Sequence, residues 1–144
     1  MKLNQDKCHL LVPGHKYENI FANIGQSLIW ESPKEKLLGL DIDKDLKFNE
    51  YVLSLCKKAG QKLSVLKRIC NYMNFKQRKI LMKSFIEAQF GYYSWIWMFC
   101  GRTENTKINH IYERSLRIVY KDYSSSFNDL LKKAETFTIH HRNI

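Results

Sequence analysis

Few residues in this chain interrupt regular structure. Its 144 residues include 2 Pro and 6 Gly, which argues against a loop-rich or fibrous protein. The 4 Cys (Cys8, Cys56, Cys70 and Cys100) form no Cys-x-x-Cys pair, so neither a zinc knuckle nor a dithiol redox motif is expected. They are also too sparse for a secreted disulfide scaffold. We therefore expect free thiols in a reducing compartment.

The sequence also lacks a long hydrophobic run. The most apolar stretch, residues 90–100, spans 11 residues, whereas a membrane-spanning helix needs about 20. We interpret it as a buried helix, with an interfacial membrane helix as the alternative. No signal-peptide apolar region follows the first charged residues. We therefore expect an intracellular protein, nuclear or cytoplasmic, that does not bind membranes.

Motifs of a self-contained catalytic site are missing. There is no Gly-rich phosphate loop, no Gly-x-Ser-x-Gly and no His-Glu-x-x-His. Asp41, Asp43 and Asp45 resemble the start of a calcium loop, but Leu46 and Val52 replace its required Gly and Glu. We interpret the three Asp as a polar strand end, and predict no catalytic residue, metal site or cofactor in this chain.

The chain does contain enough apolar residues for a core and a large excess of positive charge. Hydrophobic residues make up 44% and aromatic residues 13%, so disorder is not expected. Residues 1–46 carry 6 Lys/Arg and 7 Asp/Glu, net −1, whereas residues 47–144 carry 18 and 7, net +11. A basic region of this kind favours an anionic partner, with nucleic acid ahead of membrane.

The sequence pattern changes at the same place as the charge and predicts an α+β fold. Residues 1–46 have short apolar runs separated by turn residues, which predicts a small antiparallel β part. Residues 47–144 have helical periodicity, which predicts a mainly α-helical bundle. The candidate strands are residues 8–12, a hairpin of 17–24 and 27–31 around Gly25-Gln26, and 36–42, where Gly39 marks a tight bend or bulge.

Four helices are predicted in the second part, over residues 48–73, 75–98, about 103–120 and 127–134. Cys56 and Cys70 fall on the apolar stripe of the first helix, which makes them core thiols. Asn74 and Gln77 form a capping box for the second. The end of the second helix is almost wholly apolar and aromatic, so we expect it to be buried at the centre of the helical part. Alternatively, its aromatic side chains stack on nucleic-acid bases or form an interface to another domain. Thr103 or Asn105 is expected to cap the third.

Basic residues recur at helical spacing in the third helix. Five of them span an arc of about 80° at 100° per residue: Lys107, His110, Arg114, Arg117 and Lys121. Like charges at these spacings repel, so the stripe favours a surface that faces phosphates. An ordinary solvated face is the alternative. Four further basic residues lie off the apolar stripe of the first helix and complete the candidate nucleic-acid-binding set: Lys57, Lys58, Lys62 and Arg68.

An ordered set of local patterns resembles the reverse transcriptases of jockey-type non-LTR retrotransposons. Residues 3–12, LNQDKCHLLV, are similar to the Asn-x-x-Lys-Cys segment that follows the active-site strand. Residues 36–48 resemble the Leu-Gly-x-x-x-Asp…Leu-x-Phe segment that leads from palm to thumb. Residues 81–92, 97–99, 108–120 and 139–143 resemble the region beyond the thumb.

This resemblance implies the end of a palm followed by thumb-like helices that grip a primer–template duplex. Such polymerases bind two Mg²⁺ ions through Asp residues that include a Tyr/Phe-Ala-Asp-Asp hairpin. That tetrapeptide does not occur here, and the family layout would place it before Met1. We therefore expect a catalytically incomplete fragment that binds nucleic-acid duplexes weakly and non-specifically, with the palm and fingers domains as further partners. A stand-alone basic nucleic-acid-binding module and a helical protein-interaction module are the alternatives.

Overall fold

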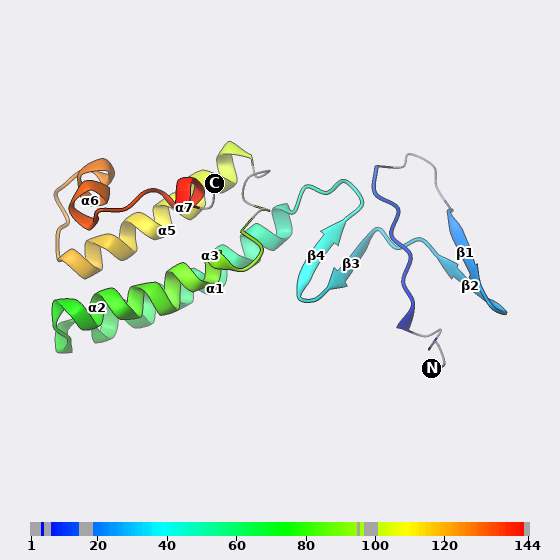
Figure 1. The fold of residues 1–144 in the computed structure, drawn as a ribbon, viewed down its shortest axis with the longest axis horizontal. Coiled ribbons are helices and arrows are strands. Elements are labelled where there is room, and N and C mark those ends of the chain that lie inside the picture. Colours follow the sequence, from blue (N-terminus) through cyan, green and yellow to red (C-terminus); the bar gives the residue numbers. More distant parts are fainter. Residues whose placement is uncertain (1–3, 5–6, 15–18, 95, 97–100, 143–144) are drawn as a thin grey trace. The chain divides into compact units, whose positions relative to one another are not determined.

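The computed structural model describes residues 4, 7–14, 19–94, 96 and 101–142 (Figure 1). The chain divides into two compact units, Met1–Tyr51 and Val52–Ile144, called here the N-terminal unit and the helical unit. The first contains two small antiparallel sheets, and helices follow. The predicted α+β class is thus confirmed.

Two hairpins form the described sheets of the N-terminal unit. Strands β1 (Phe21–Ile24) and β2 (Ser27–Trp30) pair antiparallel around Gly25-Gln26, as predicted. Strands β3 (Lys34–Leu37) and β4 (Leu40–Asp43) pair in the same way. Leu38 and Gly39 join them with φ of 50° and 88°, the left-handed conformation that a tight two-residue turn requires. Residues 36–42, predicted as a single strand with a tight bend or bulge at Gly39, are instead divided by this turn between β3 and β4. Residues 17–18 of the predicted first strand lie outside the described residues.

The strand predicted over residues 8–12 is wrong. Leu10 makes a single parallel bridge to Glu31, and its carbonyl accepts the N–H of Ser32 at 2.9 Å. Pro13 and Gly14 then turn the chain, and the N–H of Gly14 donates to the carbonyl of Lys44. A short apolar run alone does not distinguish a strand from an irregular segment, because its backbone partners come from elsewhere in the chain.

The polar end of β4 organises the turn that precedes the first helix. The carboxylate of Asp43 accepts the backbone N–H groups of Lys47 and Phe48 at 3.0 and 3.3 Å. Asp45 forms an ion pair with Lys47 at 2.9 Å. These carboxylates therefore have local structural partners. Among the described residues no group of three His, Cys, Asp or Glu side chains is placed to hold a metal ion.

Local sequence signals place the first helices correctly. Helix α1 (Asn49–Ile69) and the 3₁₀ turn η2 (Cys70–Tyr72) confirm the helix predicted over 48–73. Helix α2 (Phe75–Met82) begins at the predicted capping box, in which Asn74 and Gln77 exchange hydrogen bonds of 2.9 and 3.0 Å. Cys70 is buried and Cys56 half-buried, and both are free thiols.

The helix predicted over 75–98 ends early. A π-helical segment, η3 (Lys83–Glu87), follows α2, and α3 (Ala88–Gly91) ends the helical run. Tyr92 is extended and 57% exposed, which contradicts complete burial of the aromatic end. Gly91 and the aromatic residues after it have weak helix propensity, which explains the early end. Phe90 and Ile96 are buried, whereas residues 95 and 97–98 of the predicted helix lie outside the described residues.

Helix α5 (Arg102–Tyr120) is the centre of the helical unit. Its buried side chains, which include Ile108, Tyr112, Leu116 and Val119, face α2, η3, α6 (Phe127–Ala134) and α7 (Ile139–Arg142). Its N-cap is Gly101 without a side-chain hydrogen bond, so neither predicted cap is right. The predicted 127–134 helix is confirmed by α6. No helix in the described part of the chain is both long and apolar enough to cross a membrane.

Arg78 connects α2 to the end of α5 from inside the protein. Its side chain is only 9% exposed, although arginine is normally a surface residue. Its Nε donates to the carbonyl of Val119 at 3.0 Å, and its Nη1 donates to the carbonyl of Met73 at 2.8 Å. Both carbonyls lie near helical C-termini, where backbone acceptors lack partners within the helix.

Candidate nucleic-acid interface

Helix α5 carries four of the five residues of the predicted basic stripe. Lys107, His110 and Arg114 are exposed, and Arg117 is half-buried. The helix ends at Tyr120, and Lys121 adopts a left-handed conformation with φ of 53°. The stripe therefore ends at Arg117, because the helical spacing that would align Lys121 with it stops one residue earlier.

The last cation of the stripe is already paired. Arg117 Nη2 lies 2.6 Å from Oε1 of Glu113, and the two side chains are 22% and 23% exposed. The other carboxylate oxygen lies 3.9 Å from Nδ1 of His110. Nη1 of Arg117 is buried and has no hydrogen-bond partner among the described residues. Arg117 is thus held in place by Glu113, and Lys107 and Arg114 are the accessible Lys and Arg residues of the stripe.

The predicted basic residues of α1 fall on two sides of that helix. Lys57, Lys58 and Arg68 are exposed and Lys62 is half-buried. At 100° per residue, Lys57 and Arg68 share one side, whereas Lys58 and Lys62 lie on the other. The four therefore do not form one surface.

Helices α1 and α5 run in the same direction beside each other. Burial raises the pKa of the Cys56 thiol in α1, and the positive charge of Lys107 in α5 opposes that shift, so these residues are neighbours. Further along both helices, Lys67 of α1 and Arg114 of α5 line the same groove. Because the residue numbers rise together, the two helices are parallel and the exposed edge of α5 follows one edge of α1.

A groove of about 220 Å³ lies between the two helices. Seven residues line it: Leu63, Ser64, Lys67, Arg114, Arg117, Ile118 and Tyr123. Lys67 lies at the flank of the apolar stripe of α1, one helical turn after Leu63, and is not among the predicted nucleic-acid-binding residues. Tyr123, which follows α5, is not among them either. Only the packing of α1 beside α5 brings these residues together.

We define the basic face as five exposed cations: Lys107 and Arg114 of α5, Lys67 of α1, which shares the groove with Arg114, and Lys57 and Arg68, which lie 80° and 100° from Lys67 around α1 at 100° per residue. Among the described residues, none of the five takes part in an ion pair. His110 lies beside them on α5 and adds charge only when protonated. Lys58 and Lys62 lie outside this face.

The loop that carries Tyr123 is held by Asp122. The carboxylate of Asp122 accepts the backbone N–H of Ser125 at 3.1 Å and its hydroxyl at 2.8 Å. Lys133 donates to the same carboxylate at 3.0 Å. The hydrogen bond from Lys133, followed by those from Ser125, holds the pKa of Asp122 well below its usual range. The ring of Tyr123 remains 66% exposed at the rim of the groove.

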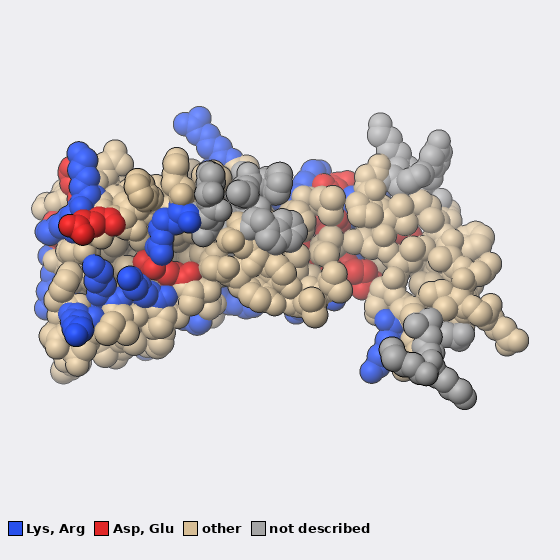
Figure 2. All heavy atoms as spheres, in the orientation of Figure 1, with Lys and Arg blue, Asp and Glu red and all other residues tan. Residues whose placement is uncertain are grey.

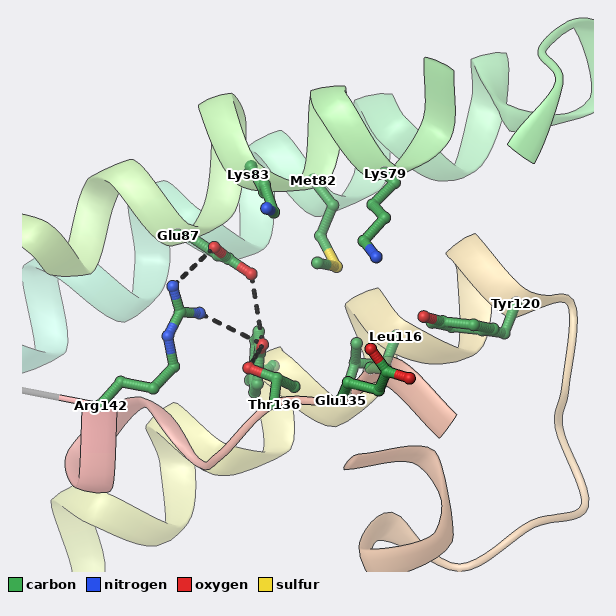
Figure 3. Close-up of a pocket in the computed structure, with 11 residues that line it drawn as sticks. Lys79, Met82, Lys83, Glu87, Leu116, Tyr120, Glu135, Thr136 and Arg142 are labelled. Carbon is green, nitrogen blue, oxygen red and sulfur yellow. Dashed lines mark hydrogen bonds and ion pairs between the residues drawn. The ribbon is translucent and has the colours of Figure 1, made fainter. Parts of the chain in front are cut away.

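A second hollow lies on another side of α5 (Figure 3). Glu87, in the π-helical segment, pairs with Arg142 of α7 at 3.0 Å and accepts the hydroxyl of Tyr112 at 3.2 Å. Arg142 also donates to the Tyr112 oxygen at 3.3 Å. Lys79 and Lys83 line the same hollow. The side chains of Glu87, Tyr112 and Arg142 satisfy one another, so the network joins α7 to η3 and α5.

Comparisons with known proteins give no relative for this chain: no protein-family model, no curated protein and no solved structure matches it. In the view of Figure 2, most of the Lys and Arg side chains gather over the helices, in agreement with the net charges of −1 for residues 1–46 and +11 for residues 47–144.

Proposed function

We propose that this chain is a catalytically incomplete piece of a non-LTR retrotransposon RNA-directed DNA polymerase. In this proposal, its helical unit binds the phosphate backbone of a primer–template duplex. The family assignment rests on the ordered sequence patterns, and the binding role rests on the basic face. The observation that carries the binding role is the convergence of unpaired cations from two helices along one edge.

The dimensions of the basic face suit a duplex backbone. Lys107 and Arg114 are seven residues apart in α5, which is two helical turns or about 10 Å. Double-stranded DNA carries one negative charge for roughly every 1.7 Å of its axis, so about six phosphate charges pass along that length. Lys67, from the neighbouring helix, adds a cation beside Arg114. The face can therefore contact several phosphates without reading any base pair.

The N-terminal unit supports the proposal that the chain is part of a larger enzyme. Phe21, Leu28 and Trp30 lie on the exposed side of the β1–β2 hairpin, and the rings of Phe21 and Trp30 are 5.4 Å apart. Exposed apolar patches on a short hairpin favour contact with further protein. In the proposed enzyme that protein is the rest of the palm and the fingers, which would also supply the Asp residues that bind Mg²⁺.

Salt dependence of binding tests the proposed function. The full chain is titrated against a fluorescently labelled RNA–DNA duplex at several KCl concentrations, and affinity is measured by anisotropy. With three to five phosphate contacts, log K should fall linearly with log salt with a slope of about −3 to −4.5, each contact contributing roughly 0.9 as it does for duplex DNA. Absence of binding at low salt, or a slope near zero, contradicts the proposal.

A further inference from the structure

The groove between α1 and α5 contains a feature that binding to a phosphate backbone does not require. Leu63 and Ile118 form its base, and with 3% and 4% of their surfaces exposed they belong to the core and offer a ligand almost no surface. Tyr123, however, presents an aromatic ring at the same groove. Phosphates gain nothing from aromatic surface, so this part of the basic face suits a ligand with a flat apolar ring.

We propose that the groove holds one unpaired nucleobase, stacked on Tyr123, while Lys67 and Arg114 contact the phosphates on either side of it. This inference rests on the proposed function and makes it more specific. The preferred nucleic acid is then a duplex with an adjoining single strand rather than a continuous duplex. Bases freed from pairing expose their ring faces, and proteins commonly bind them by stacking on aromatic side chains or on Arg.

The groove offers each contact that such a nucleotide needs. The exposed ring of Tyr123 supplies the face on which the base stacks, while the two unpaired cations, Lys67 and Arg114, attract the flanking phosphates. The hydroxyl of Ser64 donates to the carbonyl of Gly60 at 3.1 Å, which leaves its oxygen lone pairs to accept an amino or imino group of the base. An acidic peptide would use the cations but would leave the ring without a partner.

Tyr123 is positioned before a ligand arrives. Asp122, the residue before Tyr123, accepts hydrogen bonds from the backbone N–H and the hydroxyl of Ser125. Lys133 of α6 donates to the same carboxylate and so anchors Asp122 to that helix. A ring held by such a loop loses less conformational entropy on stacking than a ring on a free terminus. Tyr72 provides a comparison, since it is 91% exposed in η2 and lies outside the groove.

The test compares two duplexes that carry the same charge. Both have a short single-stranded overhang, normal in one and made of abasic nucleotides in the other. We expect the full chain to bind the normal overhang roughly 5- to 150-fold more tightly, the range given by base–aromatic stacking. Tyr123→Ser should remove this preference, whereas Tyr123→Phe and the control Tyr72→Ser should keep it.

The outcomes separate this inference from the proposed function. Equal affinity for the two overhangs, together with a steep salt dependence, overturns the base site and leaves backbone binding intact. Failure to bind either duplex at low salt overturns both. Polyglutamate serves as the peptide probe: if it competes as well as the normal overhang and loses this ability in Tyr123→Ser, the groove binds acidic protein segments and the base site is wrong.

Discussion

Replacing Lys107 and Arg114, the two accessible Lys and Arg residues of the stripe on α5, should change the salt dependence of binding by a calculable amount. Lys107 and Arg114 are exposed and make no ion pair among the described residues. Each phosphate contact contributes about 0.9 to the slope of log K against log salt, so Lys107→Gln with Arg114→Gln should reduce its steepness by about 1.8. At about 0.1 M salt the same two contacts account for a roughly 60-fold loss of affinity. Anisotropy titrations of the RNA–DNA duplex measure both quantities.

The structure provides a charge-matched control for this double variant. Lys79 and Lys83 line the hollow that includes Tyr112, which lies on a different side of α5 from Arg114. Lys79→Gln with Lys83→Gln removes the same charge and should leave the slope nearly unchanged. If the two double variants weaken binding equally, only net charge matters and the basic face is an ordinary solvated surface.

Three further predictions test the fold and the missing chemistry. Arg78→Met leaves the carbonyls of Met73 and Val119 unpaired and should lower the free energy of unfolding by about 2–6 kcal/mol, at 1–3 kcal/mol for each lost partner; a loss below 1 kcal/mol in urea unfolding would show that the clamp is not needed. The depressed pKa of Asp122 means that its charge stabilises the folded state above about pH 4 and that this contribution is lost as the pH falls further. Asp122→Asn should therefore be less stable than the wild type at pH 7 and closer to it at pH 3, and a gap in thermal stability that widens on acidification contradicts this. Primer extension on a primed RNA template with Mg²⁺ or Mn²⁺ should show no incorporation above a mock preparation, and incorporation would disprove the incomplete-enzyme interpretation.

Local patterns predicted those elements whose signals are complete within a few residues. Helix α6 has the expected bounds, because its apolar periodicity and its N-cap, Ser126, are both local signals. The Asn74 capping box and the Gly25-Gln26 turn were predictable for the same reason. Helical periodicity continues in the sequence after Gly91 and so predicts a helix through residue 98. The backbone nevertheless turns away after Gly91, and periodicity alone does not show where that happens.

The candidate site was only partly predictable because it is made by two helices. Periodicity within α5 placed Lys107 and Arg114 on one exposed edge. It could not show that Lys67 of α1 lies beside them, since no local signal encodes the packing of residues so far apart in sequence. Nothing in the sequence around Arg78 distinguishes it from the basic residues beside it, Lys76 and Lys79, because the Val119 carbonyl that makes it a buried clamp lies 41 residues away. The nucleic-acid role of the stripe itself stays a prediction.

Lysine footprinting tests the central claim most directly, because it maps the bound surface residue by residue. The full chain is acetylated with and without the RNA–DNA duplex at low salt, and modification is quantified by mass spectrometry. We expect the duplex to protect Lys57, Lys67 and Lys107, while Lys79 and Lys83 remain as reactive as in the free protein. Equal protection of all five lysines, or protection of Lys79 and Lys83 alone, would contradict a binding face between α1 and α5.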